Sequence, residues 1–378
     1  MHPEDFDPAQ RGLLLRHPTD YWAFVPSPLP PAIGLTPELL RALSDADRAI
    51  GELAGAGGWQ PDPHILIDPF LRREAVLSSR IEGTIATVTD LALFEVDAKA
   101  SEARDAQEVL NYVRALELAT DPKRTLPLSL RLIRDLHRTL MTGVRGIVAT
   151  PGEFRRTQNW IGPAGCLLKE ATFVPPPVDQ MTPALHELEA YLHGDDSLPS
   201  LIRIALVHYQ FEAIHPFLDG NGRIGRLLVS LLMQEWHLLP APLLYLSAFF
   251  ESRRDDYYRH LLSVSTHGTW DTWIRFFLEG VASQSRDVID RARRLTELRE
   301  DYHRRVQVSR ASALLLRLVD HLFERPAITV TGAKEVLGVT FRAASQNVQK
   351  LVAAGILHET TGRERNRIYV ASEILDLL

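Results

Sequence analysis

The chain has 378 residues, which is enough for two or three domains with hydrophobic cores. The formal net charge of −6 gives no whole-protein reason to expect nucleic acid or an anionic membrane as a partner. The only cysteine, Cys166, excludes an intrachain disulfide, and no apolar run is long enough to span a membrane. The acidic, polar start MHPEDFDPAQ is unlike a signal peptide. These features predict a soluble cytoplasmic protein without membrane contacts.

Most of the chain has the spacing of amphipathic helices. Residues 1–31 are rich in proline and predict an irregular arm that wraps a domain. After this arm, apolar residues recur three and four apart, which is the period of a helix with one buried face. The predicted helices begin at about Thr36, run from Asp68 to Gly83, cover 105–119 and 128–142, resume at about Thr182, and then cover 203–214, 224–236, 253–263 and 270–298.

Two segments differ from this helical pattern. Residues 150–181 are rich in glycine, proline and β-branched or aromatic residues, and they predict a β-hairpin or flap. The last seventy or so residues give helix, short helix, turn, helix and a basic hairpin at Gly362, which is the order of a winged helix-turn-helix. A charged helical connector near 294–304 precedes this module.

The stretch HPFLDGNGRIGR, residues 215–226, contains the pattern G-x-G-x-x-G. A Rossmann phosphate loop needs a strand before the first glycine, but the preceding residues have helical spacing. The lysine and aspartate motifs of kinases and the lysine motif of P-loop proteins are absent. We therefore exclude these three kinds of phosphate site.

The chemistry of the same twelve residues nevertheless predicts a polyphosphate site. The glycines on either side of Asn221 allow backbone N–H groups to converge on an anion, and a helix that begins there favours negative charge. Arg223 and Arg226 are three apart and can both bind phosphate oxygens. Asp219 is a suitable ligand for Mg²⁺, and His215 can act as a base near neutral pH.

These residues resemble the full signature of the Fic-domain family, His-Pro-Phe-x-Asp-Gly-Asn-Gly-Arg-x-x-Arg. RTQNWIGP with FVPPP resembles the family's flap, and LYLSAFFESRRDDYY resembles the segment that lines its adenine pocket. Together these features cover roughly residues 30 to 290. The resemblance implies a mainly α fold: a Fic-type helical bundle with a β-hairpin flap, here followed by the winged helix-turn-helix. The expected regions are an N-terminal arm and helices over 1–120, a catalytic core over 121–298 and the C-terminal module over 299–378.

The resemblance also implies an activity, the transfer of AMP from ATP to a hydroxyl side chain of a target protein. His215 would be the catalytic base, and Asp219 would hold Mg²⁺ between the α- and β-phosphates. Arg223 and Arg226 would bind the β- and γ-phosphates, and the flap would align the target as an added strand. The full set of expected nucleotide-binding residues is Glu82, Asn159, Trp160, Ile161, Gly162, Gly220, Asn221, Gly222, Arg223, Ile224, Gly225, Arg226, Tyr257 and Tyr258.

The stretch LSSRIEGT contains a second motif. Ser78 and Glu82 are four apart and share a helix face that ends at Gly83, which by itself indicates no more than a capped polar helix. Beside a Fic core, Ser78, Glu82 and Gly83 match the family's inhibitory motif, [Ser/Thr]-x-x-x-Glu-[Gly/Asn]. The Glu82 carboxylate would pair with Arg226 and occupy the place of the γ-phosphate.

Several functions remain open from the sequence. The first is an autoinhibited, Mg²⁺-dependent protein adenylyltransferase. The second is a DNA-binding regulator whose Fic-like core senses nucleotide, with Arg342, Gln346, Asn347 and Lys350 on the predicted recognition helix. The third is a Fic enzyme that moves another group, such as UMP or phosphocholine, or that removes AMP. The C-terminal module could bind DNA or protein, and the helical surfaces permit a homodimer.

Overall fold

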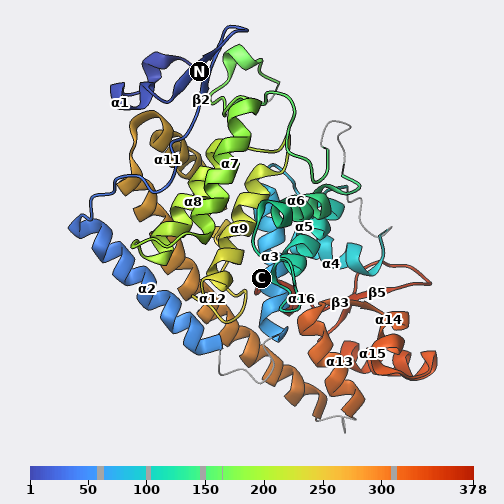
Figure 1. Ribbon diagram of the computed structural model, residues 1–378. Coiled ribbons are helices and arrows are strands. Elements are labelled where there is room, and N and C mark those ends of the chain that lie inside the picture. Colours follow the sequence, from blue (N-terminus) through green and yellow to red (C-terminus); the bar gives the residue numbers. More distant parts are fainter. Residues whose placement is uncertain (58–63, 99–103, 145–149, 164, 308–312) are drawn as a thin grey trace.

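The computed structural model describes residues 1–57, 64–98, 104–144, 150–163, 165–307 and 313–378. Over these residues the chain is mainly helical, with two small antiparallel sheets, which confirms the predicted fold class (Figure 1). The longer helices up to the C-terminal region are α2 (Pro37–Gly57), α3 (His64–Ile81), α4 (Val88–Val96), α5 (Arg104–Thr120), α6 (Leu130–Met141), α7 (Val178–His193), α8 (Ser200–Ile214), α9 (Asn221–Glu235), α10 (Ser247–Ser252), α11 (Arg254–His267) and α12 (Trp270–Gln307).

Helix α8 lies at the centre of the bundle, where it contacts α7, α9, α11 and α12. Apolar residues surround it on nearly every side, as expected for a helix buried all round. The buried indole of Trp273 in α12 donates a hydrogen bond from Nε1 to the Ala205 carbonyl of α8 at 3.0 Å. This packing holds α8 in the bundle, and the HPFLDGNGRIGR turn begins at its C-terminal end.

Helix α12 is longer than the sequence pattern predicts. It is 38 residues long and passes without interruption through the predicted connector at 294–304. Its N-terminal part packs along α2, so that the two helices run side by side at one edge of the molecule (Figure 1). Charged residues dominate its last turns, and such residues are compatible with an exposed helix as well as with a linker.

Helix α3 begins before the predicted start. The Asp-Pro pair at residues 68 and 69 indicated the first turn, but the helix starts at His64 and Pro69 lies inside it. A proline inside a helix costs about 3 kcal/mol because it removes a hydrogen bond and crowds the preceding turn. Contacts with α5, α10 and α13 on several sides hold α3 in place despite this local cost.

The N-terminal arm and the flap also differ from the sequence expectation. The arm, expected to be irregular, forms the short helices η1 (Pro3–Asp5) and α1 (Pro8–Arg11) and a hairpin of β1 (Leu14–His17) and β2 (Tyr21–Phe24). The flap has less strand than predicted, since its only pairing among the described residues is a single bridge between Ile161 and Phe173. A 3-10 turn, η2 (Leu168–Glu170), lies within the flap. Phe24 donates its N–H to Val174, so the arm extends the flap by one further contact.

The C-terminal region has the element order helix, strand, helix, helix, strand, strand. Its elements are α13 (Ala313–Glu324), β3 (Ala327–Thr329), α14 (Val330–Leu337), α15 (Phe341–Ala353), β4 (His358–Glu359), β5 (Ile368–Val370) and a last turn α16 (Ser372–Leu375). The strands pair antiparallel in the order β3–β5–β4. This region packs against the N-terminal helices, α13 on α3 and β3 on α4 (Figure 1). Its buried side chains join the same apolar core that includes α2, α8 and α12.

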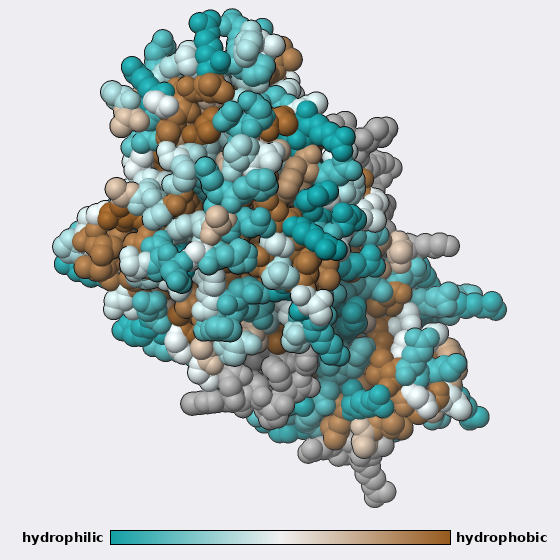
Figure 2. Space-filling view, in the orientation of Figure 1, coloured by the Kyte–Doolittle hydropathy of each residue, from teal (hydrophilic) through white to brown (hydrophobic). Residues whose placement is uncertain are grey.

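No helix in the described part of the chain is long and apolar enough to cross a membrane. The face shown in Figure 2 mixes polar and apolar residues, with polar ones predominating over its centre.

Candidate functional site

The turn between α8 and α9 is set by two residues in the left-handed region. His215 ends α8 with φ +50° and donates its N–H to Phe211. Gly220 precedes α9 with φ +81°, a conformation that glycine adopts without the steric cost of a side chain. The predicted helix start at Ile224 is therefore three residues late, because α9 begins at Asn221 directly after this glycine. His215 and the first turn of α9 lie at the two ends of one short turn.

Side chains from the turn and from α6 fix its shape. Asn221 donates from Nδ2 to the Phe217 carbonyl at 2.8 Å, and its Oδ1 accepts the Phe217 N–H at 2.8 Å. His137 stacks on the Phe217 ring with centroids 3.7 Å apart, and its Nε2 lies 3.0 Å from the Asp219 carbonyl. Because its side chain is committed to the turn, Asn221 can offer an anion only its backbone N–H.

Two residues of the flap segment hold the backbone of His215. Arg155 donates from Nε to the His215 carbonyl at 3.0 Å, and Asn159 donates from Nδ2 to the same carbonyl at 3.2 Å and to that of Phe217 at 2.8 Å. Asn159 is among the residues that the sequence predicts for the site, whereas Arg155 and His137 are not. Arg155 and His137 are both buried. No sequence pattern marks a buried polar side chain that forms a hydrogen bond with a backbone group far away in the chain.

The geometry defines the protonation state of His215. Its Nδ1 lies 3.2 Å from the Glu212 carbonyl, which can only accept, so Nδ1 holds the proton and Nε2 has the free lone pair. Burial lowers the pKa of His215 to about 4, against the smaller opposing effect of this hydrogen bond. The imidazole is therefore neutral at pH 7, with one nitrogen available to accept a proton.

The N-terminus of α9 has no side-chain cap. The first N–H groups of a helix lack intrahelical partners, and the helix dipole adds partial positive charge at the same place. Glycine at 222 keeps this turn open. The first turn of α9 is therefore suited to bind an anion such as phosphate.

In this structure a carboxylate from α3 lies against that turn. Glu82, one residue beyond the end of α3, forms an ion pair with Arg226 of α9, with Oε1 2.7 Å from Nη2. Ser78 accepts a hydrogen bond from Arg226 Nε at 2.8 Å through Oγ and another from Nη2 at 2.9 Å through its carbonyl. Glu82 lies directly over Gly222, because a Cβ there would come within 2.2 Å of its Oε1 and the carboxylate would have to move.

The Arg226 cation determines the protonation state of Glu82. Burial raises the pKa of Glu82, but the Arg226 cation outweighs it, and the net pKa lies below the usual value. Arg226 itself is 3% exposed, and Glu82 raises its pKa. The pair is therefore fully ionised at neutral pH and occupies the anion site with a protein carboxylate.

Arg223 and Asp219 lie on the other side of the turn. Arg223 pairs with Glu108 of α5 at 3.3 Å and lies 3.5 Å from Asp219, while its Nε is buried without a partner in the described residues. Asp219 is exposed, and its Oδ1 accepts the Gly220 N–H at 2.6 Å. No cluster of three or more metal-ligating side chains occurs among the described residues, so a cation here would need ligands from a bound molecule as well as Asp219.

Comparison with known proteins identifies the fold and its family. Two family models match the chain, Fic/DOC family N-terminal over residues 40–121 and Fic/DOC family over residues 127–233. The chain belongs to the Fic/DOC family. Among curated relatives, Protein adenylyltransferase Fic of Drosophila grimshawi is 31% identical over 156 residues, which are 41% of this chain and 29% of that protein. The corresponding protein of Drosophila virilis is also 31% identical, over 41% of this chain and 28% of its own length. The matched part is less than a third of the length of these relatives.

Solved structures agree with this assignment. A Fic family protein from Desulfovibrio desulfuricans G20 superposes with a TM-score of 0.58 at 20% identity, over 91% of this chain and 98% of that one. Fic-1 from C. elegans superposes with a TM-score of 0.54 at 20% identity, over 69% of this chain and 75% of the other. At these identities the likeness establishes the fold alone.

The flap of this Fic protein exposes apolar side chains beside the turn. Trp160 and Ile161 are each 39% exposed, and Trp160 donates from Nε1 to the Cys166 carbonyl at 3.0 Å. Gly162 packs so closely on Cys166 that a Cβ would lie 2.6 Å from the sulfur. Cys166 thus packs inside the flap against Gly162.

The two tyrosines of α11 have different environments. Tyr257 is 1% exposed, and its hydroxyl lies 2.8 Å from Nε2 of the buried His208. Tyr258 is 40% exposed and stands under the Arg254 guanidinium, 5.6 Å from the ring centre. The buried tyrosine supports the walls of the site, and the exposed one is available to stack on a ligand.

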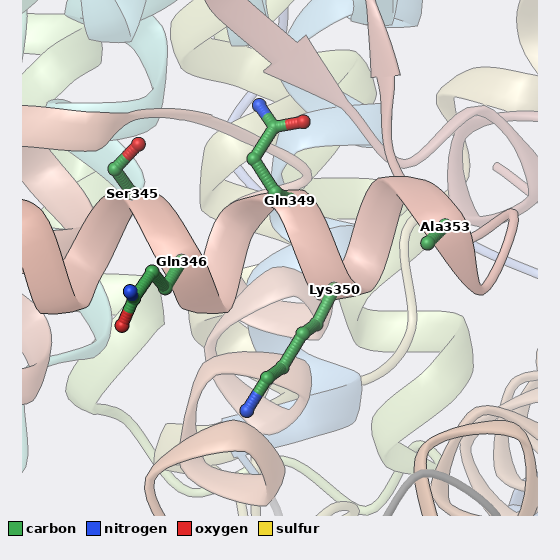
Figure 3. Close-up of a pocket in the computed structure, with 5 residues that line it drawn as sticks. All are labelled: Ser345, Gln346, Gln349, Lys350 and Ala353. Atoms are coloured by element: carbon green, nitrogen blue, oxygen red, sulfur yellow. The ribbon is translucent and has the colours of Figure 1, made fainter.

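A second surface of this Fic protein lies on α15. A groove is lined by Ser345, Gln346, Gln349, Lys350 and Ala353, whose polar side chains project from the helix (Figure 3). Arg342 and Phe341 are exposed one turn earlier, and no acidic residue occurs between 340 and 357. Asn347, which the sequence predicts on the recognition helix with Arg342, Gln346 and Lys350, is buried and donates to the Ala343 carbonyl at 2.9 Å.

Two buried acids near the turn predict how stability depends on pH. Burial raises the pKa of Glu74 to about 7 and that of Glu212 to about 8, so both are protonated in the fold well above their ordinary range. Between pH 6.5 and 8 the unfolded chain has already lost these protons, so the fold binds more protons and loses stability as pH rises. The midpoint of thermal unfolding, followed by circular dichroism, should fall over this window. A constant or rising midpoint would contradict it.

Proposed function

We propose that this chain is an autoinhibited, Mg²⁺-dependent protein adenylyltransferase that transfers AMP from ATP to a Ser, Thr or Tyr hydroxyl of a target protein. The observation that supports it most is the neutral His215, which presents a free Nε2 beside an uncapped helix N-terminus with Arg226 on the same helix. The names of the Drosophila relatives, Protein adenylyltransferase Fic, favour AMP as the transferred group.

In this proposal each residue of the turn has a separate role. His215 removes the proton from the target hydroxyl as the oxygen attacks the α-phosphate, and pyrophosphate leaves. The N–H groups of Asn221, Gly222 and Arg223 stabilise the charge that grows on phosphate oxygens in the transition state. Arg226 binds the terminal phosphate once Glu82 has left.

Asp219 is the residue that fits Mg²⁺. It is an exposed hard oxygen ligand beside the anion site, and Mg²⁺ is usually held by one or two carboxylates together with substrate phosphates. A bound Mg²⁺ would neutralise phosphate charge. The chain's part is to place one carboxylate oxygen at the end of the turn, where the Gly220 N–H orients it.

The exposed apolar flap supports a protein target. Trp160, Ile161 and Leu167 are exposed, and Leu167 is 56% exposed. An extended segment of a target could add to the flap edge and bring a hydroxyl towards His215. Gly162, Gly220 and Gly225 contribute backbone space rather than side-chain contacts in this arrangement, whereas the Ile224 side chain is buried in the apolar core and holds α9 in place.

The decisive experiment uses ATP labelled at either the α- or the γ-phosphate, with Mg²⁺, purified protein and cell lysate. Protein-bound α-label without γ-label is the result expected of AMP transfer. Absence of α-label from wild type and from a Glu82→Gly variant would reject it and favour another donor, tested next with labelled UTP and CDP-choline. Release of AMP from a premodified target measures the reverse reaction in the same preparation.

Ser78→Ala is expected to weaken the inhibition by a smaller amount than loss of Glu82. The substitution removes one hydrogen bond to a charged partner, which contributes about 1.5 kcal/mol, so transfer should rise roughly tenfold. Ser79→Ala is the matched control, because Ser79 is equally buried and its Oγ has no partner in the described residues. Equal rates in the two variants would show that the Ser78 contact has no inhibitory effect.

We also propose that residues 299–378 form a winged helix-turn-helix module, after an N-terminal region over 1–120 and a core over 121–298. The acid-free face of α15, with Arg342 and Lys350 exposed, favours duplex DNA as its partner. A gel shift at moderate salt tests this, with Arg342→Ala and Lys350→Ala together expected to abolish retention. No retention by the wild type would favour a protein-docking role.

A further inference from the structure

Glu212 is a buried carboxyl group that the proposed mechanism does not use. It lies one turn before His215 on α8, and its Oε1 is buried without a hydrogen-bond partner among the described residues. Its side chain lies against Gly225, where a Cβ would come within 2.2 Å of Oε1. Gly225 therefore makes the space that this carboxyl fills.

The position of Glu212 repeats that of Glu82. Glu82 lies over Gly222 and Glu212 over Gly225, each with Oε1 at 2.2 Å from the place of a Cβ. The two glycines are three apart and share one face of α9, where the positions of their Cβ atoms would be about 5–6 Å apart, so the two carboxyl groups lie over neighbouring points of that face. Arg226 follows directly on the same helix, and its Nη1 would be 3.0 Å from a Cβ at Gly222. One cation thus has two carboxyl groups within reach.

We propose that Glu212 is the reserve counter-ion of Arg226: it is neutral while Glu82 holds the cation, and it loses its proton and pairs with Arg226 when Glu82 leaves. The released proton goes to solvent and is taken back when a nucleoside triphosphate brings new negative charge to Arg226. Glu212 is thus a positioning residue, since it acts through Arg226. Only the nucleotide step of this proposal rests on the proposed function.

The charges around Glu212 support this exchange. Burial raises the pKa of Glu212 to about 8, Arg226 lowers it and the Glu82 carboxylate raises it. Departure of Glu82 therefore leaves the attraction of Arg226 unopposed, and the carboxyl ionises more easily. The other titratable neighbours are neutral near pH 7: His208 and His215 on α8 have pKa values lowered to about 3 and about 4, and the pKa of Tyr257 on α11 is raised.

Glu74 is the other buried acid near Arg226, but it lacks a vacant oxygen. Its Oε1 accepts from Ser247 Oγ at 2.5 Å and from Tyr112 at 3.3 Å, and its Oε2 accepts the Ser247 N–H at 3.2 Å. A carboxyl with both oxygens engaged has no reason to move to a new partner. Glu74 therefore serves as the matched control for Glu212.

The first test measures the protonation of Glu212 directly and needs no nucleotide. Infrared difference spectra at pH 7 compare each protein with its Glu212→Gln variant. Wild type should show the carbonyl band of a protonated carboxyl, and the Glu82→Gly protein should show carboxylate bands in its place. The same protonation state in both backgrounds would overturn the proposal. If Glu212→Gln does not fold, Gly225→Ala replaces it, because its Cβ displaces the Glu212 carboxyl without removing it. The spectral change between the wild-type and Glu82→Gly backgrounds should then be absent.

The second test measures proton uptake when a non-hydrolysable ATP analogue binds, by calorimetry in buffers of different ionisation enthalpy. The Glu82→Gly protein should take up close to one proton when the analogue binds. Its Kd for the analogue should therefore rise up to tenfold per pH unit above the pKa of Glu212 in the nucleotide-free protein. Adding Glu212→Gln should remove the uptake, whereas adding Glu74→Gln should leave it. Binding without uptake would overturn the role of Glu212. Failure of the analogue to bind, with the infrared change present, would instead reject the proposed nucleotide site.

Discussion

Transfer of AMP by the Glu82→Gly variant is expected to exceed that of the wild type roughly 10²-fold. The substitution removes the carboxylate that lies 2.7 Å from Arg226. Breaking an ion pair whose arginine is buried and whose carboxylate is 33% exposed involves about 3 kcal/mol, the lower end of the range for buried pairs. Arg226 then becomes available to the terminal phosphate, and the α-phosphate can align with His215. The measurement is the initial rate of α-label incorporation at saturating ATP.

Two controls separate this effect from general loosening of the fold. Glu82→Gln keeps the side-chain volume and removes the charge, so it should reproduce most of the gain. Glu38→Gly replaces an exposed glutamate of α2 that pairs only at the surface with Arg41, and it should leave the rate unchanged. Equal rates for wild type and Glu82→Gly would contradict an inhibitory role for the ion pair.

His215→Ala in the Glu82→Gly background is expected to lower the transfer rate by about 10²- to 10⁴-fold, the usual contribution of a positioned general base. Nucleotide affinity should change little, because the anion site is built from α9 and Arg226 rather than from the imidazole. The rate and the Kd for an ATP analogue are measured on the same preparation.

A histidine elsewhere provides the control for this substitution. His186 is exposed on α7, and His186→Ala should retain the parent rate. Because the pKa of His215 is lowered to about 4, kcat of the active background at saturating ATP should stay constant as pH falls from 7 to 5. Loss of activity with a midpoint near pH 6.5 would show that His215 is solvated like a free imidazole, contrary to its position here.

The helical fold followed closely from apolar spacing, and the differences have local causes. The start of α3 was placed at the Asp-Pro pair because proline usually marks a first turn, yet packing on three neighbouring helices keeps Pro69 inside the helix. The end of α12 was placed at 298 because its last turns are charged. The hairpin β1–β2 was missed because prolines before and after it resemble an irregular arm.

The sequence by itself determined the chemical character of the site. His215, Asp219, the glycines on either side of Asn221 and the two arginines lie within twelve residues, and the Asp-Gly-Asn-Gly sequence favours a turn that brings them together. The spacing of Ser78 and Glu82 likewise fixed their common helix face. These inferences depend on local geometry, which the order of residues specifies.

Only the tertiary structure decided which distant groups complete that site. The contact of Glu82 with Arg226 joins residues 144 apart, and the bonds of Arg155 and His137 to the turn span 60 and 82 residues. Burial of Glu212 against Gly225 is of the same kind, since it depends on how α8 and α9 pack. Protonation follows from these contacts, because desolvation and charge partners, and not residue type alone, set the pKa of a buried group.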